Sequence, residues 1–141
     1  MQWPIKILLV HPKAPFMQDK KLTISADCAL VVNKEISEKF GKEALIIGCP
    51  MLEDPRRMFE KIRLIVDESS AEEIEIFSME VPCCQAIHMM VEKANEERKE
   101  KGKSEIKVTR KIVRVNGETE EYTGEVDESM LQAEIKAHRG G

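Results

Sequence analysis

Residues 44–68 read ALIIGCPMLEDPRRMFEKIRLIVDE and contain one complete strand–helix unit. The apolar run at residues 44–48 predicts a buried strand. Asp54 followed by Pro55 predicts a helix start, because the first helical position does not need the N–H that proline lacks. The apolar side chains that recur every three or four residues after it are Met58, Ile62, Ile65 and Val66. They predict a buried helix face and, together with the strand, an α/β fold.

The same alternation extends to both sides of this unit. Further strands are predicted at residues 22–26, 73–77 and 106–115, and further helices at residues 28–40 and 82–101. Repeated strand–helix units imply right-handed crossovers and strands that run mainly in parallel. The expected fold is therefore a three-layer α/β domain, with a mainly parallel sheet and helices on both of its faces.

The two ends of the chain are less regular. Residues 5–10 read as one more buried strand, whose pairing is left open because no helix separates it from the next strand. An Asn-Gly turn signal stands at residues 116–117, and the segment after it is polar and acidic. We expect one α/β domain at residues 1–117 and a loosely ordered acidic C-terminal tail at residues 118–141, which could form a short helix at residues 129–138.

The composition excludes several classes of protein. The chain has 141 residues, a net charge of −4, 42% hydrophobic residues and 34% charged residues. Lysines and arginines alternate with glutamates, so nucleic-acid binding through phosphate neutralisation is not expected. No apolar run reaches the ~20 residues of a membrane span, and residues 5–10 are too few for the core of a signal peptide. We expect a cytoplasmic protein whose cysteines serve metal or redox chemistry rather than disulfides.

All four cysteines follow a predicted strand and stand near the start of a predicted helix. Cys28 and Cys49 each follow one strand, and Cys83 and Cys84 together follow another. Parallel strands end at the same edge of a sheet, which is where open α/β sheets place their sites. Helix N-termini also favour ionised thiols. We therefore predict that the four sulfurs gather at the carboxyl edge of the sheet as one thiolate site for a metal ion or cluster.

The spacing of the cysteines is long. Twenty residues separate Cys28 from Cys49, thirty-three separate Cys49 from Cys83, and no Cys-x-x-Cys occurs. Zinc-ribbon and thioredoxin-like motifs are thereby excluded, and the tertiary fold must assemble the site. Cys83 and Cys84 diverge by roughly 100° on a helix, so either one supports the other or both serve a cluster. The competing interpretation is that all four are small buried hydrophobes at tight junctions.

Other side chains near the cysteines are also candidates. His88 lies four residues after Cys84 on the same helical face, where it is a further metal ligand, a base for a thiol, or a partly buried helix histidine. Asp27 and Asp54 stand where helix caps are expected. Glu80 has no such explanation, and it either orients a ligand or is a solvated loop carboxylate.

Three motifs carry a resemblance to a known family: Ala-Asp-Cys at residues 26–28, Gly-Cys-Pro-Met-Leu-Glu-Asp at residues 48–54 and Met-Glu-Val-Pro-Cys-Cys at residues 79–84. They resemble the Asp-Cys, Cys-Pro and Pro-Cys-Cys domain of poorly characterised ferredoxin-like (4Fe-4S) iron–sulfur proteins of anaerobic archaea and bacteria. The resemblance covers about residues 5–115, and this chain departs from it by lacking the ferredoxin module. The residues to which the resemblance assigns a metal or cluster role are Cys28, Cys49, Cys83 and Cys84.

A second similarity is to the cysteine-rich domains of heterodisulfide reductase-like proteins. In those domains a lone cysteine precedes a vicinal pair at an interval like the one that separates Cys49 from Cys83 and Cys84. They continue to a Cys-x-x-Cys, whereas this chain has no cysteine after Cys84. A noncubane cluster of that kind would therefore need Cys28 as a substitute.

These patterns favour an iron–sulfur protein that exchanges electrons with a redox protein partner in anaerobic metabolism. One alternative is a metal-free thiol or persulfide carrier that reacts through Cys83 or Cys84, and another is a zinc-binding interaction module with His88 as the fourth ligand. A nucleotide-binding enzyme is disfavoured because no Gly-rich phosphate loop follows any predicted strand, and no complete catalytic motif is present. Homo-oligomer formation is left open.

Overall fold

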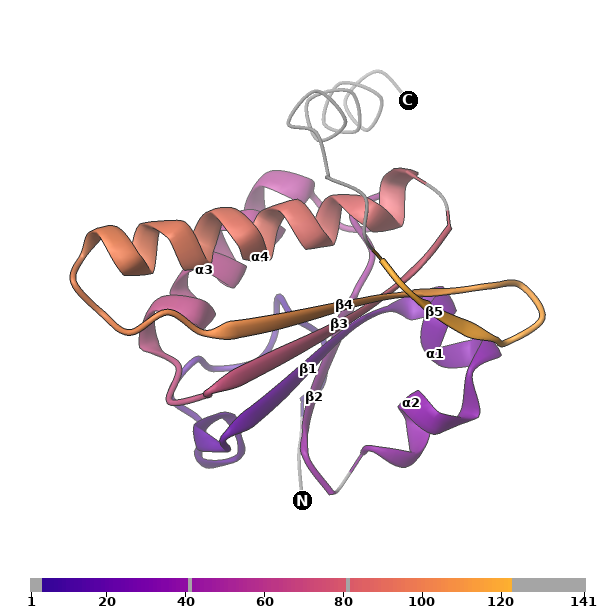
Figure 1. The fold of residues 1–141 in the computed structure, drawn as a ribbon, viewed down its shortest axis with the longest axis horizontal. Helices are drawn as coiled ribbons and strands as arrows, with labels where there is room; N and C mark the ends of the chain where they lie inside the picture. Colours follow the sequence, from indigo (N-terminus) through magenta and orange to yellow (C-terminus); the bar gives the residue numbers. More distant parts are fainter. Residues whose placement is uncertain (1–3, 41, 81, 123–141) are drawn as a thin grey trace.

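The computed structural model describes residues 4–40, 42–80 and 82–122, and it describes residues 82–84 by their backbone only. Figure 1 shows a sheet with helices packed on both sides. The strands are β1 (Lys21–Ala26), β2 (Ala44–Gly48), β3 (Glu73–Met79), β4 (Lys107–Val113) and β5 (Thr119–Glu121). The helices are the 3-10 helix η1 (Pro15–Gln18) and the α-helices α1 (Asp27–Val32), α2 (Lys34–Glu38), α3 (Pro55–Glu68) and α4 (Pro82–Glu100).

The strands form one sheet in the order β2-β1-β3-β4-β5. β1 pairs in parallel with both β2 and β3, and β3 pairs in parallel with β4, while β5 runs antiparallel to β4. The chain leaves β1 for β2 on one side and then crosses back over β1 to reach β3 on the other side. The strand order therefore reverses between β1 and β3, which is where open α/β sheets form a crevice at their carboxyl ends.

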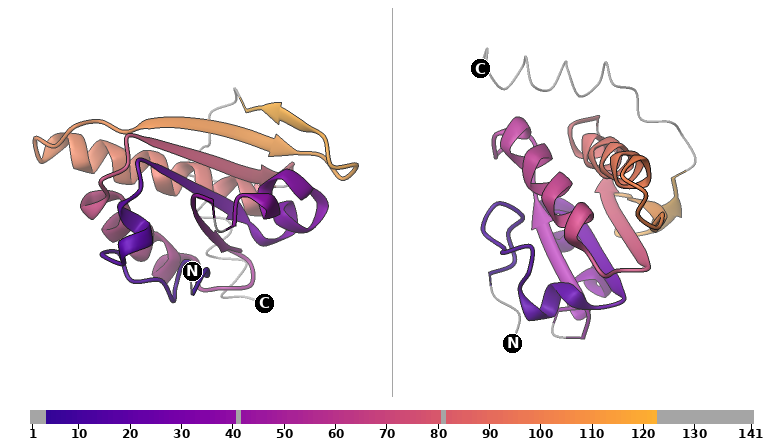
Figure 2. Two further views of the ribbon diagram at one scale, coloured as in Figure 1. Left: turned by 90° about the horizontal axis from the view of Figure 1, so that it is seen from below. Right: turned by 90° about the vertical axis from the view of Figure 1, so that its left-hand side faces the viewer.

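The helices lie in two layers. α3 and α4 cover one face of the sheet, and α1 and α2 lie on the other face (Figures 1 and 2). α1 and α2 connect β1 to β2, whereas α3 and α4 belong to the crossovers that run in the opposite direction. Right-handed crossovers of opposite direction put their helices on opposite faces of a sheet. The three-layer α/β fold with a mainly parallel sheet is therefore confirmed.

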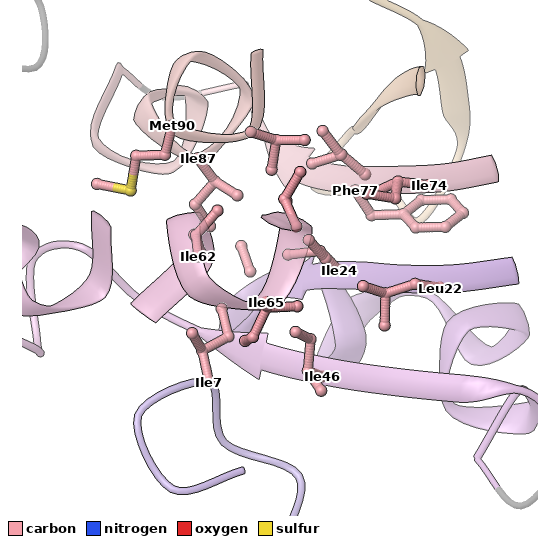
Figure 3. Packing of buried hydrophobic residues seen from close by; sticks show 14 of the residues in the cluster. Ile7, Leu22, Ile24, Ile46, Ile62, Ile65, Ile74, Phe77, Ile87 and Met90 are labelled. Atoms are coloured by element: carbon pink, nitrogen blue, oxygen red, sulfur yellow. The ribbon is translucent and has the colours of Figure 1, made fainter. Parts of the chain in front are cut away.

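The main apolar core lies between the sheet and the α3–α4 layer. Ile62 and Ile65 of α3 lie with Ile87 of α4, Ile24 of β1 and Ile46 of β2 (Figure 3). Each of these five side chains is at most 1% exposed. Because full burial of such a side chain stabilises the fold by about 1.5–3 kcal/mol, this layer supplies a large part of the driving force for folding.

The prediction of a strand at residues 5–10 is wrong. Lys6 forms an isolated parallel bridge with Ile47 of β2, and the chain then turns back onto the carbonyl group of Lys6. Ile7 and Val10, three residues apart, are both fully buried. A turn can bury two side chains at that spacing, whereas a strand would point them to opposite faces.

The prediction of one helix at residues 28–40 is also wrong, because the helix is interrupted at Asn33. The backbone of Asn33 is extended, with φ −120° and ψ 110°. Its side-chain oxygen accepts the N–H of Ile36, 3.2 Å away, and its amide group donates to the carbonyl of Gly117, 2.9 Å away. The side chain thus begins α2 and fastens it to the distant β4–β5 turn, which the local pattern could not reveal.

The sheet extends beyond the predicted domain boundary at residue 117. The turn predicted at residues 116–117 is present, and Gly117 has a φ of +93°, a conformation that favours glycine. After this turn, β5 pairs with β4. The domain therefore includes residues that were assigned to the tail, while the helix predicted at residues 129–138 lies outside the described residues.

Candidate functional site

The carboxyl ends of three adjacent strands carry the cysteines. Ala26, the last residue of β1, pairs with Gly48, the last residue of β2, and β3 flanks β1 on its other side. Cys28 is the second residue of α1, Cys49 directly follows β2, and residues 83–84 are the second and third residues of α4. The backbone therefore places all four cysteines at one edge of the sheet, as predicted.

The strand reversal divides these positions into two groups. Cys28 and residues 83–84 follow β1 and β3, which flank the reversal point. Cys49 follows β2, on the far side of β1. A ligand in the crevice between β1 and β3 would therefore be bordered by the segments that carry Cys28 and residues 83–84.

The described thiols are both available for chemistry. Cys28 is exposed, Cys49 is half-buried, and both are free cysteines. Among the side chains that the structure describes, no group of three or more His, Cys, Asp or Glu is arranged to hold a metal ion. The side chains of Cys83 and Cys84 lie outside that set, so the gathering of four sulfurs stays a prediction.

A cluster of charges lies beside Cys28 and Cys49. The Lys6 ammonium group lies 2.7 Å from the Asp27 carboxylate and 3.0 Å from the Glu53 carboxylate. The second oxygen of Glu53 accepts the backbone N–H of Cys49 at 2.7 Å. Burial by itself would lower the pKa of Lys6, but the hydrogen bonds with Asp27 and Glu53 outweigh burial and raise it. Lys6 is therefore firmly cationic at this edge.

The predicted cap role of Asp27 is wrong, and that of Asp54 is confirmed. Asp27 is the first residue of α1, and the cap residue of this helix is Ala26, whose side chain makes no cap hydrogen bond. The carboxylate of Asp27 instead pairs with Lys6 through Oδ2, and its buried Oδ1 has no hydrogen-bond partner in the described structure. Asp54 caps α3 by accepting the N–H of Arg56 at 2.9 Å.

His88 lies inside the protein, between α4 and the sheet. Its Nε2 lies 2.7 Å from the hydroxyl oxygen of Ser78 on β3, and its ring stacks on Tyr122 with the centroids 4.9 Å apart. Burial, with a smaller contribution from nearby Arg110, lowers the pKa of His88 from 6.5 to about 3. His88 is therefore neutral at physiological pH. Its Nδ1 has no hydrogen-bond partner in the described structure. The predicted role of His88 as a metal ligand stays a prediction.

Glu80 has a structural partner that the sequence pattern did not indicate. Its carboxylate pairs with the guanidinium group of Arg114, which also pairs with Glu120 on β5. The hydrogen bonds with Glu120 and Glu80 raise the pKa of Arg114. The pair joins the end of β3 to the β4–β5 hairpin at the exposed edge, which explains Glu80 without a ligand.

Two grooves lie away from the cysteines. One, of about 630 Å³, runs between α4 and β4, and another, of about 320 Å³, runs between α3 and α4. Both are lined mainly by charged side chains, and neither Cys28 nor Cys49 is among the residues that line them. None of the helices in the described part of the chain is long and apolar enough to cross a membrane.

The sequence motifs do not indicate Lys6 as part of the site. Lys6 is the single charged residue in the apolar run at residues 5–10. A lysine within a run that is otherwise apolar needs a carboxylate partner if the run is buried. That signal was present in the sequence, but the identity of the partners was not, because Asp27 and Glu53 are brought to Lys6 only by the fold.

Comparisons with known proteins agree with this architecture. The family model for the Rossmann-like domain matches residues 14–140. An uncharacterized protein of the archaeon Archaeoglobus fulgidus is 58% identical over 139 residues, which cover 99% of this chain and 96% of that protein. No solved structure matches the chain with significance.

Proposed function

The chain belongs to the Rossmann-like domain family, and we propose that this member binds an iron–sulfur cluster at the carboxyl edge of its sheet and exchanges electrons with a protein partner. The residues that would hold the cluster are Cys28, Cys49, Cys83 and Cys84. A bound cluster would supply one-electron redox chemistry. The cytoplasm of an anaerobe is part of the proposal, because thiols stay reduced there.

The single observation that carries the proposal is the strand order β2-β1-β3. It brings three segments that are far apart in the sequence to neighbouring positions at one edge, and each segment contains cysteine. Adjacent strands are about 4.8 Å apart, a spacing that thiolates on flanking loops can bridge around a small cluster. Cysteines that only filled gaps in the core would not be expected to share this edge.

The first strand–helix junction adds support. Dinucleotide-binding Rossmann domains place a Gly-rich turn there for a pyrophosphate group. In this chain the junction reads Ala26-Asp27-Cys28 and contains no glycine. An acidic residue and a thiol at this position fit a thiolate ligand site better than a site for an anionic phosphate.

The accessibility of Cys28 supports an exchange of electrons with another protein. Cys28 is exposed at the start of α1, and Val31 on the same helix is 80% exposed. Val115 in the β4–β5 turn is 75% exposed. Exposed apolar side chains near a redox centre suit a protein partner, because contact surfaces commonly have apolar centres.

The test is anaerobic reconstitution of the full chain with ferrous iron and sulfide. We expect charge-transfer absorption and near-stoichiometric iron, and a marked loss of both when Cys28, Cys49, Cys83 or Cys84 is changed singly to Ser. His88→Gln is the matched control, because the proposed cluster does not need that ring. A colourless wild-type protein without iron would contradict the proposal.

One observation favours a second candidate, a metal-free thiol or persulfide carrier. Cys28 is a free, exposed thiol at a helix N-terminus, as such a carrier requires. In this case one cysteine of the metal-free protein should react with iodoacetamide at neutral pH much faster than the others. Elemental analysis of the same sample separates both candidates from the zinc-binding alternative, in which His88→Gln should release zinc.

A further inference from the structure

We infer that Lys6 is a positioning residue of the cysteine edge: it ties the segment that carries Cys28 to the segment that carries Cys49 through two carboxylates. The inference rests on the proposed function in taking these two cysteines as parts of one site. Its structural basis lies entirely within described side chains, and it can be tested without metal.

The Lys6 ammonium group contacts two carboxylates. On one side, the Lys6 ammonium group bonds to Oδ2 of Asp27 at 2.7 Å, and Asp27 is joined directly to Cys28 in the chain. On the other side, the same ammonium group lies 3.0 Å from Oε1 of Glu53. One cation thus lies between the carboxylate of the first residue of α1 and that of the loop that follows β2.

Glu53 links Lys6 to the backbone of Cys49. Its Oε2 accepts the N–H of Cys49 at 2.7 Å. Gly48 leaves the space for this contact, since a Cβ added at Gly48 would lie 2.9 Å from Oε2 of Glu53 and 2.7 Å from the end of the Met58 side chain. The backbone that presents the Cys49 thiol is therefore fixed by the same carboxylate that Lys6 holds.

Lys6 is itself held in place by the sheet. The N–H of Ile7 bonds to the carbonyl of Ile47 at 2.8 Å, and the N–H of Ile47 bonds to the carbonyl of Ile5 at 2.9 Å. Ile7 is fully buried. The ammonium group thus extends from a fixed backbone. Oδ1 of Asp27 is buried without a hydrogen-bond partner in the described structure, and Oδ2 of the same carboxylate contacts Lys6.

A site built beyond the ends of the strands needs such a link. Strand residues are held by ladder hydrogen bonds, but Cys28 and Cys49 lie beyond the last ladder pair, Ala26 with Gly48. Ligands of a metal or cluster must be held within roughly 0.5 Å of their working positions, which depends on supporting contacts around them. Lys6 supplies such contacts for the start of α1 and for the loop after β2 at once.

The experiment measures the separation of the Cys28 and Cys49 segments directly. In the full chain with Cys83→Ser and Cys84→Ser, nitroxide spin labels are attached to Cys28 and Cys49, and electron paramagnetic resonance gives the distribution of distances between them. Lys6→Met removes the charge and keeps the apolar stem, and we expect it to broaden this distribution about twofold, because the supporting contacts are lost. Lys6→Arg keeps the charge and should restore the narrow distribution.

Two further variants complete the test. Lys21→Met is the matched control, since Lys21 pairs with Glu43 and Glu75 at the other end of β1, and its distribution should equal that of the parent. Glu53→Gln weakens the tie on one side and keeps Lys6 with Asp27, so it should give partial broadening even if Lys6→Met does not fold. Unchanged distributions in folded Lys6→Met or Glu53→Gln would overturn the inference.

Reconstitution with iron separates this inference from the proposed function. If the wild-type chain retains iron, Lys6→Met should retain less of it, and Lys6→Arg should recover the loss. If the wild-type chain retains none, the proposed cluster fails, and the spin-label distances still decide whether Lys6 positions the Cys28 and Cys49 segments.

Discussion

Two of the clusters of lysines and carboxylates in the described part of the molecule are built in opposite ways. At the carboxyl edge, one lysine, Lys6, lies between two carboxylates, Asp27 and Glu53. On the α1–α2 face of the sheet, one carboxylate, Glu75, lies among three lysines. Both are ion-pair clusters, but the first joins segments beyond the ends of the strands, whereas the second is centred on strands that the sheet already pairs.

The cluster around Glu75 belongs to the framework of the fold. The ammonium groups of Lys21 on β1, Lys39 at the end of α2 and Lys111 on β4 lie 3.6, 3.3 and 3.0 Å from its carboxylate. The Glu75 residue is 6% exposed. Burial alone would raise the pKa of Glu75, but the hydrogen bond with Lys111 and the charges of the lysines lower it below its ordinary value.

The ion pairs of Glu75 and those of Lys6 have different structural effects. Around Glu75 the strands are fixed by ladder hydrogen bonds, so the charges add stability to an arrangement that exists without them. Around Lys6, Asp27 begins a helix and Glu53 lies in a loop, both beyond the ladder of the sheet, so the charges contribute to how these two segments lie relative to one another. We therefore expect changes at Glu75 to alter global stability most, and changes at Lys6 to alter local order most.

The largest expected effect on stability is that of Glu75→Gln. It removes a nearly buried carboxylate from three lysines that are 19–37% exposed, two of which keep Glu43 as a partner. Loss of hydrogen bonds to a charged group costs about 1.5–3 kcal/mol of the free energy of unfolding. Urea denaturation at pH 7 measures the change. Glu73→Gln on the same strand is the control, and a loss no greater than that of the control would contradict this role of Glu75.

The acid sensitivity of Glu75 follows from the direction of its pKa. Because the pKa is lower in the folded state than its ordinary value of 4.5, the unfolded chain binds a proton first as the pH falls. The stabilisation is present above pH 4.5 and is lost as the pH falls through the folded-state pKa. As the pH falls below 5, the free energy of unfolding should therefore decrease less in Glu75→Gln than in the wild type.

The second effect is the pH dependence that His88 produces. Its pKa falls from 6.5 to about 3 on folding, so the unfolded chain binds a proton that the folded chain excludes. The free energy of unfolding should drop as the pH is lowered from 6.5 toward 3, by up to about 1.4 kcal/mol per pH unit. His88→Gln should flatten this slope in urea titrations, while His11→Gln, at an exposed position, should keep it. Equal slopes in all three proteins would show that His88 is not the cause.

A smaller global effect is expected for Lys6→Met. The Lys6 side chain is 29% exposed, so solvent weakens its ion pairs and the loss in the free energy of unfolding should be about 1 kcal/mol. The local effect should be clearer, because Glu53 loses the cation that helps hold it against the N–H of Cys49. Hydrogen exchange at that amide should accelerate, and Lys21→Met should leave it unchanged. Protection of Cys49 that survives in Lys6→Met would count against the contrast between the two clusters.

The smallest effect is expected for Arg114→Gln. Its ion pairs with Glu80 and Glu120 lie at the solvent-exposed edge, where water and salt screen charges. The thermal midpoint should change little, and any change should shrink further at high salt. A large fall in the midpoint would show that the β4–β5 hairpin depends on this arginine.

Much of the fold was predictable because local patterns set the main elements. The apolar run at residues 44–48 is β2, and Asp54 with Pro55 begins α3, where Met58 and Ile62 are fully buried as predicted. A strand or helix with one strong apolar face needs no distant information to be recognised. The interruption at Asn33 was not predictable, because the contact that favours it is with the carbonyl of Gly117.

The sequence by itself determined the alternation of strands and helices and the position of a cysteine after each of three strands, because apolar periodicity and chain order are local properties. Only the tertiary structure decided that these strands lie as β2-β1-β3, that Lys6 lies between Asp27 and Glu53, and that His88 faces Ser78 and Tyr122. Those relations join residues that are distant in the chain, and they arise because burying the apolar faces of α3 and α4 fixes one arrangement of the sheet. The charged and polar side chains then take the partners that this arrangement brings within reach.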